Sequence, residues 1–204
     1  MRFFYSIMVK KTAIIIGLGE IGRSWLRELR RHPEWECIGI VDTDTELLEN
    51  LKSFGIDEEN GYISIEDAVK YGEKPDLAII GTPIYTHHSL ARECMDLDIN
   101  VICEKNMAST IYQAKQMVQA AMDKPYLCTA LGTQYRYETP QWNAKKFLQE
   151  ENQIGELGMI SWYSADYRGE KRWGWRRWLQ DIYLEDMAVH WFDTLRYITG
   201  MDIV

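Results

Sequence analysis

The first 130 residues alternate short apolar runs with longer amphipathic stretches. Residues 12–17 (TAIIIG) form a β-branched run that ends in glycine, which is typical of a strand buried on both faces. In residues 20–31 apolar positions recur at helical spacing, and basic residues collect near the end, where they favour the helix dipole. The same criteria predict strands at residues 36–42, 76–81, 100–103 and 126–130, and helices around 47–51, after Ser64, at 89–97 and at 109–122.

This βαβα alternation predicts an α/β fold over residues 8–133, namely a doubly wound parallel sheet of the Rossmann type. Crossover connections between parallel strands are right-handed, so few other topologies fit the pattern.

The pattern changes after residue 135, and we expect a second domain at residues 134–204. Its sequence predicts a helix at 140–150, a turn at 154–158, an aromatic-rich antiparallel strand at 159–167, and a helix at 183–199 closed by Gly200. One strand cannot make a stable sheet, so this domain looks unfinished. We therefore expect the chain to be either a fragment or a natural truncation.

Composition narrows the class of protein. With 46% hydrophobic and 26% charged residues, the chain is typical of soluble globular proteins. A net charge of −8 leaves no basic surplus for phosphates, and no apolar run reaches the ~18 residues of a membrane span, so we expect neither a nucleic-acid nor a membrane partner. The four cysteines form no C-x-x-C pair, which indicates reduced thiols in a cytoplasmic protein.

The segment GLGEIG at residues 17–22 places G-x-G-x-x-G at a strand–helix junction. In such a loop the first glycine permits the tight turn, the second lets the backbone approach a pyrophosphate, and the third lets helix and strand pack closely. The start of the helix also offers unpaired N–H groups to the anion. The alternative is a glycine-rich turn without a ligand. We expect a dinucleotide to contact Gly17, Gly19, Glu20, Ile21 and Gly22.

Asp42 follows Gly22 by twenty residues, at the end of the next predicted strand. A carboxylate there can accept both hydroxyls of the adenosine ribose, and it repels a 2′-phosphate. Residues 43–46 (TDTE) supply no basic side chain for that phosphate. We therefore expect Asp42 to bind the cofactor and NAD to be preferred over NADP. The alternative is that Asp42 is only the N-cap of the following helix.

Four later segments resemble the Gfo/Idh/MocA family, the group of glucose–fructose oxidoreductase and inositol dehydrogenase. Residues 81–87 (GTPIYTH) resemble its T-P-N-x-x-H segment, and residues 103–106 (CEKN) resemble its E-K-P motif. Residues 154–158 (IGELG) resemble the turn into its substrate domain, and residues 184–193 (LEDMAVHWFD) its D-x-G-x-H-x-x-D helix. With the glycine loop, five motifs occur in the family's order, so the chain is identified as a member.

The resemblance implies an oxidoreductase that transfers a hydride between NAD and a sugar, cyclitol or related polyol. It implies an α+β second domain with an open, mostly antiparallel sheet, through which we expect homo-oligomers to form. It also implies further cofactor contacts from Thr82, Pro83, His87, Glu104 and Lys105.

The sequence departs from the family's motifs at three positions. Ile84 replaces asparagine, Asn106 replaces proline and Ala188 replaces glycine. Proline at 106 would help to fix the backbone that carries Lys105 through a cis bond, and asparagine leaves that geometry open. The further strands of the family's substrate sheet would come after residue 204.

Lys105, Asp186 and His190 are the candidate catalytic residues. Lys105 directly follows a strand, at the edge where doubly wound sheets bind ligands, and an ammonium there can stabilise a developing alkoxide. A histidine such as His190 suits accepting the hydroxyl proton, and Asp186, four residues earlier on the predicted helix, could orient the imidazole or contact the substrate. Taken without the resemblance, Lys105 is an ordinary surface lysine and His190 a structural histidine. We expect Asp193 either to lie on the same helix face as Asp186 and His190 or to pair with Arg196.

Three other interpretations fit parts of the sequence. A non-catalytic nucleotide-binding sensor or assembly protein, whose substrate pocket was lost by truncation, is the alternative function. The segment KRWGWRRW at residues 171–178 suits the stacking of nucleic-acid bases, but the net negative charge of the chain opposes this interpretation. The alternatives are that its tryptophans bind sugar rings or that the segment is a loop whose aromatic rings pack within the protein. Asp186, His190 and Asp193 could ligate zinc, but hydride transfer needs no metal and no H-E-x-x-H pattern is present, so we expect none.

Overall fold

The computed structural model describes residues 9–151, 153–165, 176–177, 179, 181 and 183–202. The chain divides into two compact units, Met1–Gly132 and Thr133–Val204.

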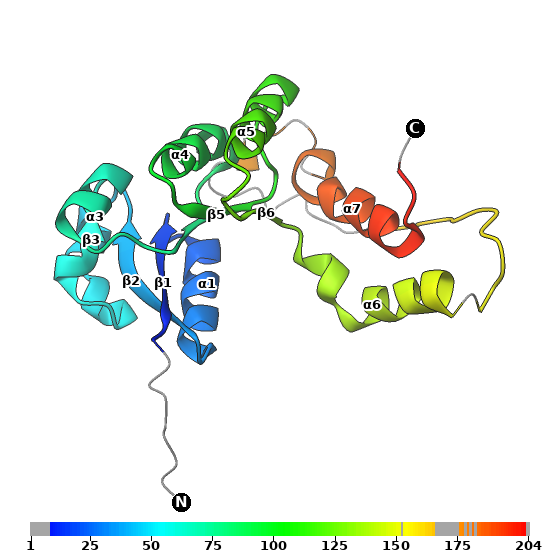
Figure 1. The fold of residues 1–204 in the computed structure, drawn as a ribbon, viewed down its shortest axis with the longest axis horizontal. Helices are drawn as coiled ribbons and strands as arrows, with labels where there is room; N and C mark the ends of the chain where they lie inside the picture. The colour runs from blue at the N-terminus through cyan, green and yellow to red at the C-terminus, as the bar shows by residue number, and fades with distance from the viewer. Residues whose placement is uncertain are drawn as a thin grey trace, which may run out of the picture. The chain divides into compact units, whose positions relative to one another are not determined.

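The first unit contains a six-stranded parallel sheet with the strand order β3-β2-β1-β4-β5-β6 (Figure 1). This order is that of the dinucleotide-binding Rossmann fold, so the predicted doubly wound sheet is confirmed. Its strands are β1 Lys11–Ile16, β2 Trp35–Val41, β3 Gly61–Tyr62, β4 Leu77–Ile80, β5 Asn100–Glu104 and β6 Thr129–Gly132. Its helices are α1 Glu20–Arg31, α2 Thr45–Leu48, α3 Ile65–Tyr71, α4 Ile84–Asp96 and α5 Ile111–Asp123.

Two apolar cores cover the two faces of this sheet, because successive side chains of a strand point to opposite faces. Ile14 and Ile16 of β1 pack in one core with buried residues of α3, α4 and α5. Ala13 and Ile15 pack in the other core with Leu26 of α1. β2 lies on one side of β1 and β4 lies on the other, so the direction of the strand order reverses at β1. The switch point of the sheet therefore lies at the carboxyl ends of β1 and β4.

Most predicted elements of this unit are confirmed to within a few residues, and α1 has both predicted bounds. Two predicted boundaries were wrong. α4 begins five residues early, at Ile84, with Pro83 as its N-cap. β6 begins at Thr129 rather than at residue 126, because a turn in which the Leu127 N–H donates to the Lys124 carbonyl precedes it. The two-residue strand β3 was not predicted.

The described residues of the second unit are mainly helical. α6 Thr139–Lys145 continues into the π-helical turn Lys146–Glu150, in place of the single predicted helix. A second π-helical turn, Tyr183–Met187, leads into α7 Ala188–Thr199. Gly200 ends α7 with a φ of +70°, as predicted. α6 and α7 pack side by side (Figure 1).

The strand predicted at 159–167 was wrong over residues 159–165, which form neither helix nor strand and are exposed. An alternating pattern makes a strand only where a neighbouring strand completes its hydrogen bonds, and no described segment of the second unit pairs with this one. The predicted antiparallel sheet is therefore not found in the described residues of this unit. Residues 166–167, and most of the KRWGWRRW segment, lie outside the described residues.

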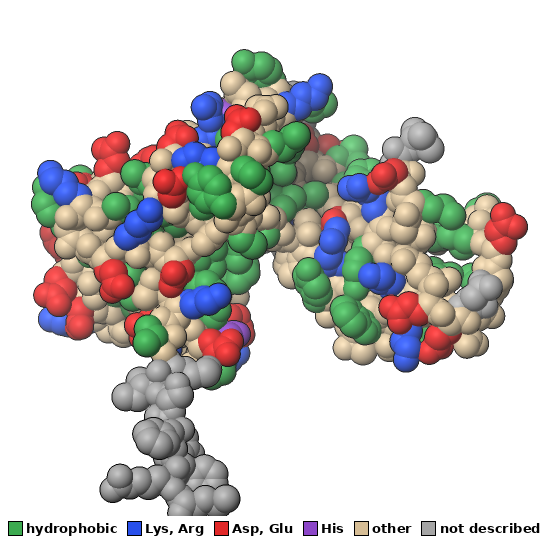
Figure 2. Space-filling model, in the orientation of Figure 1, with side chains coloured by type: hydrophobic (Ala, Val, Ile, Leu, Met, Phe, Trp, Pro, Cys, Tyr) green, Lys and Arg blue, Asp and Glu red, His purple; other side chains and the backbone are tan. Residues whose placement is uncertain are grey.

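Acidic, basic and hydrophobic side chains are interspersed on the surface of both units (Figure 2). Among the described residues, no helix combines the length and apolar character needed to cross a bilayer.

Candidate cofactor and catalytic sites

The glycine loop between β1 and α1 requires glycine at two positions. Gly17 has a φ of +86°, and a Cβ there would lie 2.6 Å from Cγ2 of Thr82. A Cβ on Gly22, in the first turn of α1, would overlap the carbonyl oxygen of Gly17. Gly19, in contrast, has open space where a Cβ would be. The loop therefore packs tightly against β4 and α1 and stays open at Gly19.

Asp42 closes this loop from the end of β2. Its Oδ2 accepts the N–H of Leu18 at 2.8 Å, and its Oδ1 accepts the N–H of Asp44 at 3.1 Å. The N-cap of α2 is Asp44, whose side chain accepts the N–H of Leu47. The interpretation of Asp42 as a plain N-cap is therefore wrong. Its carboxylate lies half-buried beside the glycine loop.

His87 connects two loops at the carboxyl edge of the sheet. The ring lies on α4 and is 1% exposed. Its Nδ1 is 2.7 Å from the carbonyl oxygen of Asn106, and its Nε2 is 2.9 Å from that of Thr82. Thr82 follows β4 and also accepts a hydrogen bond from the Thr86 hydroxyl at 2.7 Å. Thr82, Pro83 and His87 thus lie at the start of α4, beside the glycine loop.

Lys105 directly follows β5, and its side chain is half-buried. The preceding Glu104 is 8% exposed, and its Oε1 accepts the indole N–H of Trp25 at 2.8 Å. The Glu104 carboxylate also lies against Gly132, where a Cβ would approach it to 3.0 Å. The Lys105–Asn106 peptide bond is cis.

His190 and Asp186 are both buried in the second unit. The His190 ring, 2% exposed, stacks on Tyr135 with 4.1 Å between centroids and 16° between planes. The Asp186 carboxylate, 3% exposed, pairs with Nε of Arg176 at 3.1 Å. Asp186 lies in the π-helical turn that precedes α7, so α-helical i,i+4 geometry does not place the two side chains. The structure thus supplies each candidate with a neighbour that was not predicted.

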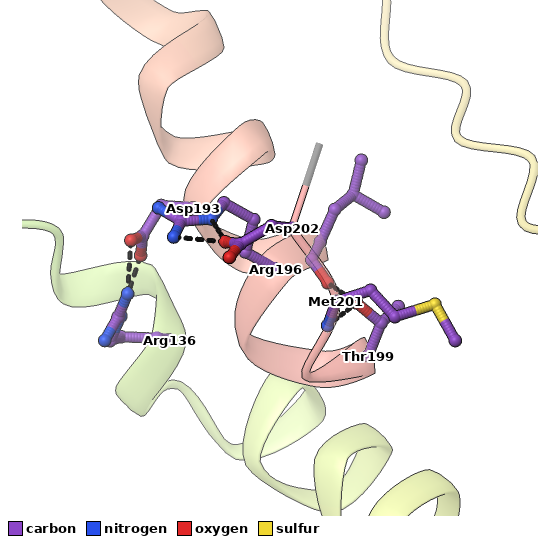
Figure 3. A network of polar contacts seen from close by, with 7 residues as sticks. Arg136, Asp193, Arg196, Thr199, Met201 and Asp202 are labelled. Atoms are coloured by element: carbon purple, nitrogen blue, oxygen red, sulfur yellow. Dashed lines mark hydrogen bonds and ion pairs between the residues drawn. The ribbon is translucent and has the colours of Figure 1, made fainter. Parts of the chain in front are cut away.

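Asp193 pairs with Arg136 rather than with Arg196 (Figure 3). Nε of Arg136 donates to Oδ2 of Asp193 at 2.8 Å, and the second guanidinium nitrogen contacts Oδ1. Arg136 lies in the turn Gln134–Tyr137, so this bidentate pair joins that turn to α7. Arg196 instead pairs with Asp202 beyond the end of α7.

Sequence reasoning missed four residues that hold the candidates: Trp25, Tyr135, Arg136 and Arg176. Trp25 occupies an ordinary apolar position of an amphipathic helix, and no pattern indicates that its indole meets a carboxylate 79 residues away. Arg176 lies in the KRWGWRRW segment. The sequence indicated ligand binding by this segment, not an ion pair between Arg176 and Asp186. Within the described residues, no group of three or more His, Cys, Asp or Glu side chains converges on one point.

The strand order, the glycine loop and Asp42 define a dinucleotide-binding α/β protein. The chain belongs to the Gfo/Idh/MocA oxidoreductase family, whose model, described as an oxidoreductase family with an NAD-binding Rossmann fold, matches residues 11–130.

Two curated relatives illustrate the family. Inositol 2-dehydrogenase 1 of Paenarthrobacter aurescens is 24% identical over 191 residues, which are 93% of this chain and 54% of the relative. Levoglucosan dehydrogenase of Pseudarthrobacter phenanthrenivorans is 28% identical over 170 residues, 79% of this chain and 42% of the relative. The chain spans about half the length of the curated relatives that it matches.

Solved structures share the fold. Apo scyllo-inositol dehydrogenase from Lactobacillus casei superposes with a TM-score of 0.80 at 20% identity, covering 95% of this chain and 56% of that one. The WlbA dehydrogenase from Bordetella pertussis, solved with NADH and UDP-GlcNAcA, gives 0.77 at 22% identity, covering 93% and 55%.

Proposed function

We propose that the protein is an NAD-dependent dehydrogenase that transfers a hydride between nicotinamide and a CH–OH group of a sugar, cyclitol or related polyol. The observation that carries this proposal is the glycine loop, closed by Asp42 at the switch point of the sheet. There the first turn of α1 offers backbone N–H groups to a pyrophosphate, and the carboxylate lies at the end of β2, where an adenosine ribose is held in such folds. Inositol 2-dehydrogenase and levoglucosan dehydrogenase among the relatives support the substrate class.

The proposed cofactor contacts come from the glycine loop with Asp42 and from the loops after β4 and β5. They are Gly17, Gly19, Glu20, Ile21, Gly22, Asp42, Thr82, Pro83, His87, Glu104 and Lys105. NAD supplies the hydride acceptor when it is bound. Lys105 directly follows β5, at the ligand-binding edge of the sheet, and its side chain carries an ammonium group. In this role Lys105 orients the substrate hydroxyl and stabilises the developing alkoxide.

In the second unit, we assign the proton acceptor to His190. Its ring is held in one plane by the stack on Tyr135. Asp186, paired with Arg176, serves as an oriented carboxylate near the start of α7. In this scheme Lys105 acts through its charge, and His190 accepts the proton of the substrate hydroxyl.

Cofactor choice tests the proposal most directly. We expect the unmodified chain to bind NADH at least about tenfold more tightly than NADPH, a difference of about 1.4 kcal/mol, by fluorescence titration. Asp42→Ala removes both the attraction for the ribose hydroxyls and the repulsion of the 2′-phosphate, so the two affinities should converge. Asp44→Ala is the matched control, since it removes the N-cap of α2 and leaves Asp42 in place. Equal affinities in the unmodified chain would contradict the assignment of NAD.

Turnover tests the catalytic roles. A screen of sugars and cyclitols with NAD, followed at the nicotinamide absorbance, identifies a substrate. Lys105→Met and His190→Asn should then leave NADH affinity within a few fold and lower turnover by roughly 10²–10⁴. The exposed His32→Asn serves as the control. Turnover retained by His190→Asn removes that residue from the mechanism, and NADH binding without turnover of any substrate favours the non-catalytic alternative.

We also propose that the protein forms homo-oligomers through its second unit, and that it works in the cytoplasm, as its cysteine pattern indicates. Large apolar side chains support the first point: Met159 is 82% and Tyr163 is 91% exposed. Light scattering tests it, and a monomer at all concentrations would overturn it.

A further inference from the structure

His87 is a buried polar side chain whose two ring nitrogens both face backbone carbonyl oxygens. The contacts are 2.7 Å from Nδ1 to Asn106 and 2.9 Å from Nε2 to Thr82. Both are within hydrogen-bonding distance, and the ring is 1% exposed, so solvent does not compete for these contacts. Both imidazole nitrogens thus face backbone groups of the protein itself.

The two carbonyls belong to different loops at the same edge of the sheet. Thr82 follows β4 and Asn106 follows β5, and these strands are adjacent and parallel, with Ile80 opposite Cys103. One side chain therefore bridges the loop that lies against Gly17 and the loop that carries Lys105.

The Lys105 backbone is held from its other side as well. Glu104 is fixed by the indole of Trp25, which comes from the helix that starts at the glycine loop. The residue before Lys105 is thus tied to α1, and the residue after it is tied to α4 through His87. Substitution of His87 would release only the second of these ties.

We propose that His87 is a positioning residue: through the Asn106 carbonyl it sets the position of the Lys105 backbone, and through the Thr82 carbonyl it fixes the loop beside the glycine turn. The inference rests on the role proposed for Lys105. It assigns His87 no contact with the substrate. Each nitrogen faces one loop, and because a carbonyl oxygen only accepts, both contacts are hydrogen bonds when each nitrogen carries a hydrogen. The two effects are therefore separable.

Asparagine and glutamine substitutions at His87 can separate the two effects. Asparagine places its side-chain nitrogen near the position of Nδ1, and glutamine places it near that of Nε2. His87→Asn keeps a donor for Asn106, and His87→Gln keeps one for Thr82. His88, the next residue of α4, provides matched controls in His88→Asn and His88→Gln.

The first measurement is amide exchange of the ligand-free chain, which needs neither cofactor nor activity. His87→Gln should speed exchange in residues 105–110 by about tenfold or more, and His87→Asn should do so in residues 81–84, because each loses about one net hydrogen bond. The His88 variants should change neither segment. Uniform acceleration across the first unit in both His87 variants would overturn the proposal and leave His87 a structural residue.

The second measurement is functional. His87→Gln should lower kcat at least about tenfold while NADH affinity stays within about threefold, and His87→Asn should weaken NADH affinity while kcat falls less. Equal losses of kcat in both variants would contradict the division of roles. If the unmodified chain binds no NADH, the proposed function fails, but the exchange experiment still decides whether His87 holds the Lys105 loop. Should the variants not fold, nitrogen NMR of the unmodified ring decides: a hydrogen on both nitrogens supports the proposal, and a bare Nδ1 or Nε2 overturns it.

Discussion

Three buried or half-buried polar side chains at the carboxyl edge of the sheet join segments that are far apart in the sequence. Asp42 binds the backbone of Leu18, Glu104 binds Trp25, and His87 contacts Asn106. The position after a strand singled out Asp42 as a candidate, and the family resemblance implied Glu104 and His87. The partners of Asp42 and His87 could not be predicted, since a hydrogen bond to a backbone group leaves no signal in the identity of the partner residue. The indole of Trp25 could not be predicted either, because tertiary packing alone brings it to Glu104.

The glycine loop gives a matched pair of substitutions. Alanine normally stabilises a helix by about 1 kcal/mol relative to glycine. Gly22→Ala should instead destabilise the chain by several kcal/mol or prevent folding, because its Cβ would overlap the Gly17 carbonyl, a backbone atom that cannot move alone.

Gly19→Ala is the control for this prediction. Nothing lies within 4 Å of where its Cβ would be, and its φ of −69° suits alanine, so the free energy of unfolding should change little. Urea unfolding followed by circular dichroism measures both variants. Equal stability of Gly22→Ala and the unmodified chain would contradict the packing described here.

At the scale of whole elements, prediction succeeded where independent signals in the sequence agreed. α1 was predicted at both ends because its apolar stripe and its basic last turn agree. The start of α4 was predicted at Ser89, a residue type that often caps helices. In the structure the Ser89 hydroxyl donates to the Thr86 carbonyl within the helix, while Pro83 precedes the first turn. A serine can cap the start of a helix or lie within the helix, and only the tertiary position of the helix decides which.

The ion pairs of α7 give a prediction at this scale. Asp193→Asn should destabilise the second unit by about 1–3 kcal/mol, because the Asp193 side chain is 14% exposed and its bidentate bond to Arg136 joins α7 to the preceding turn. Asp202→Asn should change stability by less than about 0.5 kcal/mol, because the Asp202 side chain is 80% exposed.

Both variants remove one charge from the same part of the chain, so net charge is matched. Urea unfolding followed by tryptophan fluorescence is suitable, since six of the eight tryptophans lie beyond residue 132. Equal effects of the two substitutions would mean that the Arg136 pair adds nothing to the second unit.

For the whole molecule, the two units differ in how far sequence could predict them. The first repeats one strand–helix–strand connection, and the right-handed crossover rule converts that order of elements into a strand order. The second has no such repeat, and its buried candidates depend on particular pairings such as Tyr135 with His190 and Arg176 with Asp186. The proposed catalytic residues fall in both units, and no motif indicated the side chains that contact them.

The cysteines allow the first unit to be followed separately, because all four lie within it. Burial raises the pKa of Cys94 and Cys103 to about 12 and that of Cys37 to about 11. At pH 8 a thiol of pKa about 12 is ionised to roughly one part in 10⁴, and the thiolate is the reactive form. Cys128 is exposed. A thiol reagent should therefore modify one cysteine quickly and three slowly, and Cys128→Ser should abolish the fast phase.

Saturating NADH should slow the three buried cysteines further if the cofactor binds the folded first unit. At 100 times its Kd a ligand stabilises the folded state by about 2.7 kcal/mol, so thiols that react only after the unit opens should react up to about a hundredfold more slowly. Cys128 should be unaffected, because it needs no opening. Fast reaction of Cys94 or Cys103 without NADH would contradict the core packing of α4 and β5. If the chain binds NADH but saturating NADH leaves the modification rates of the buried thiols unchanged, the cofactor binds outside this unit.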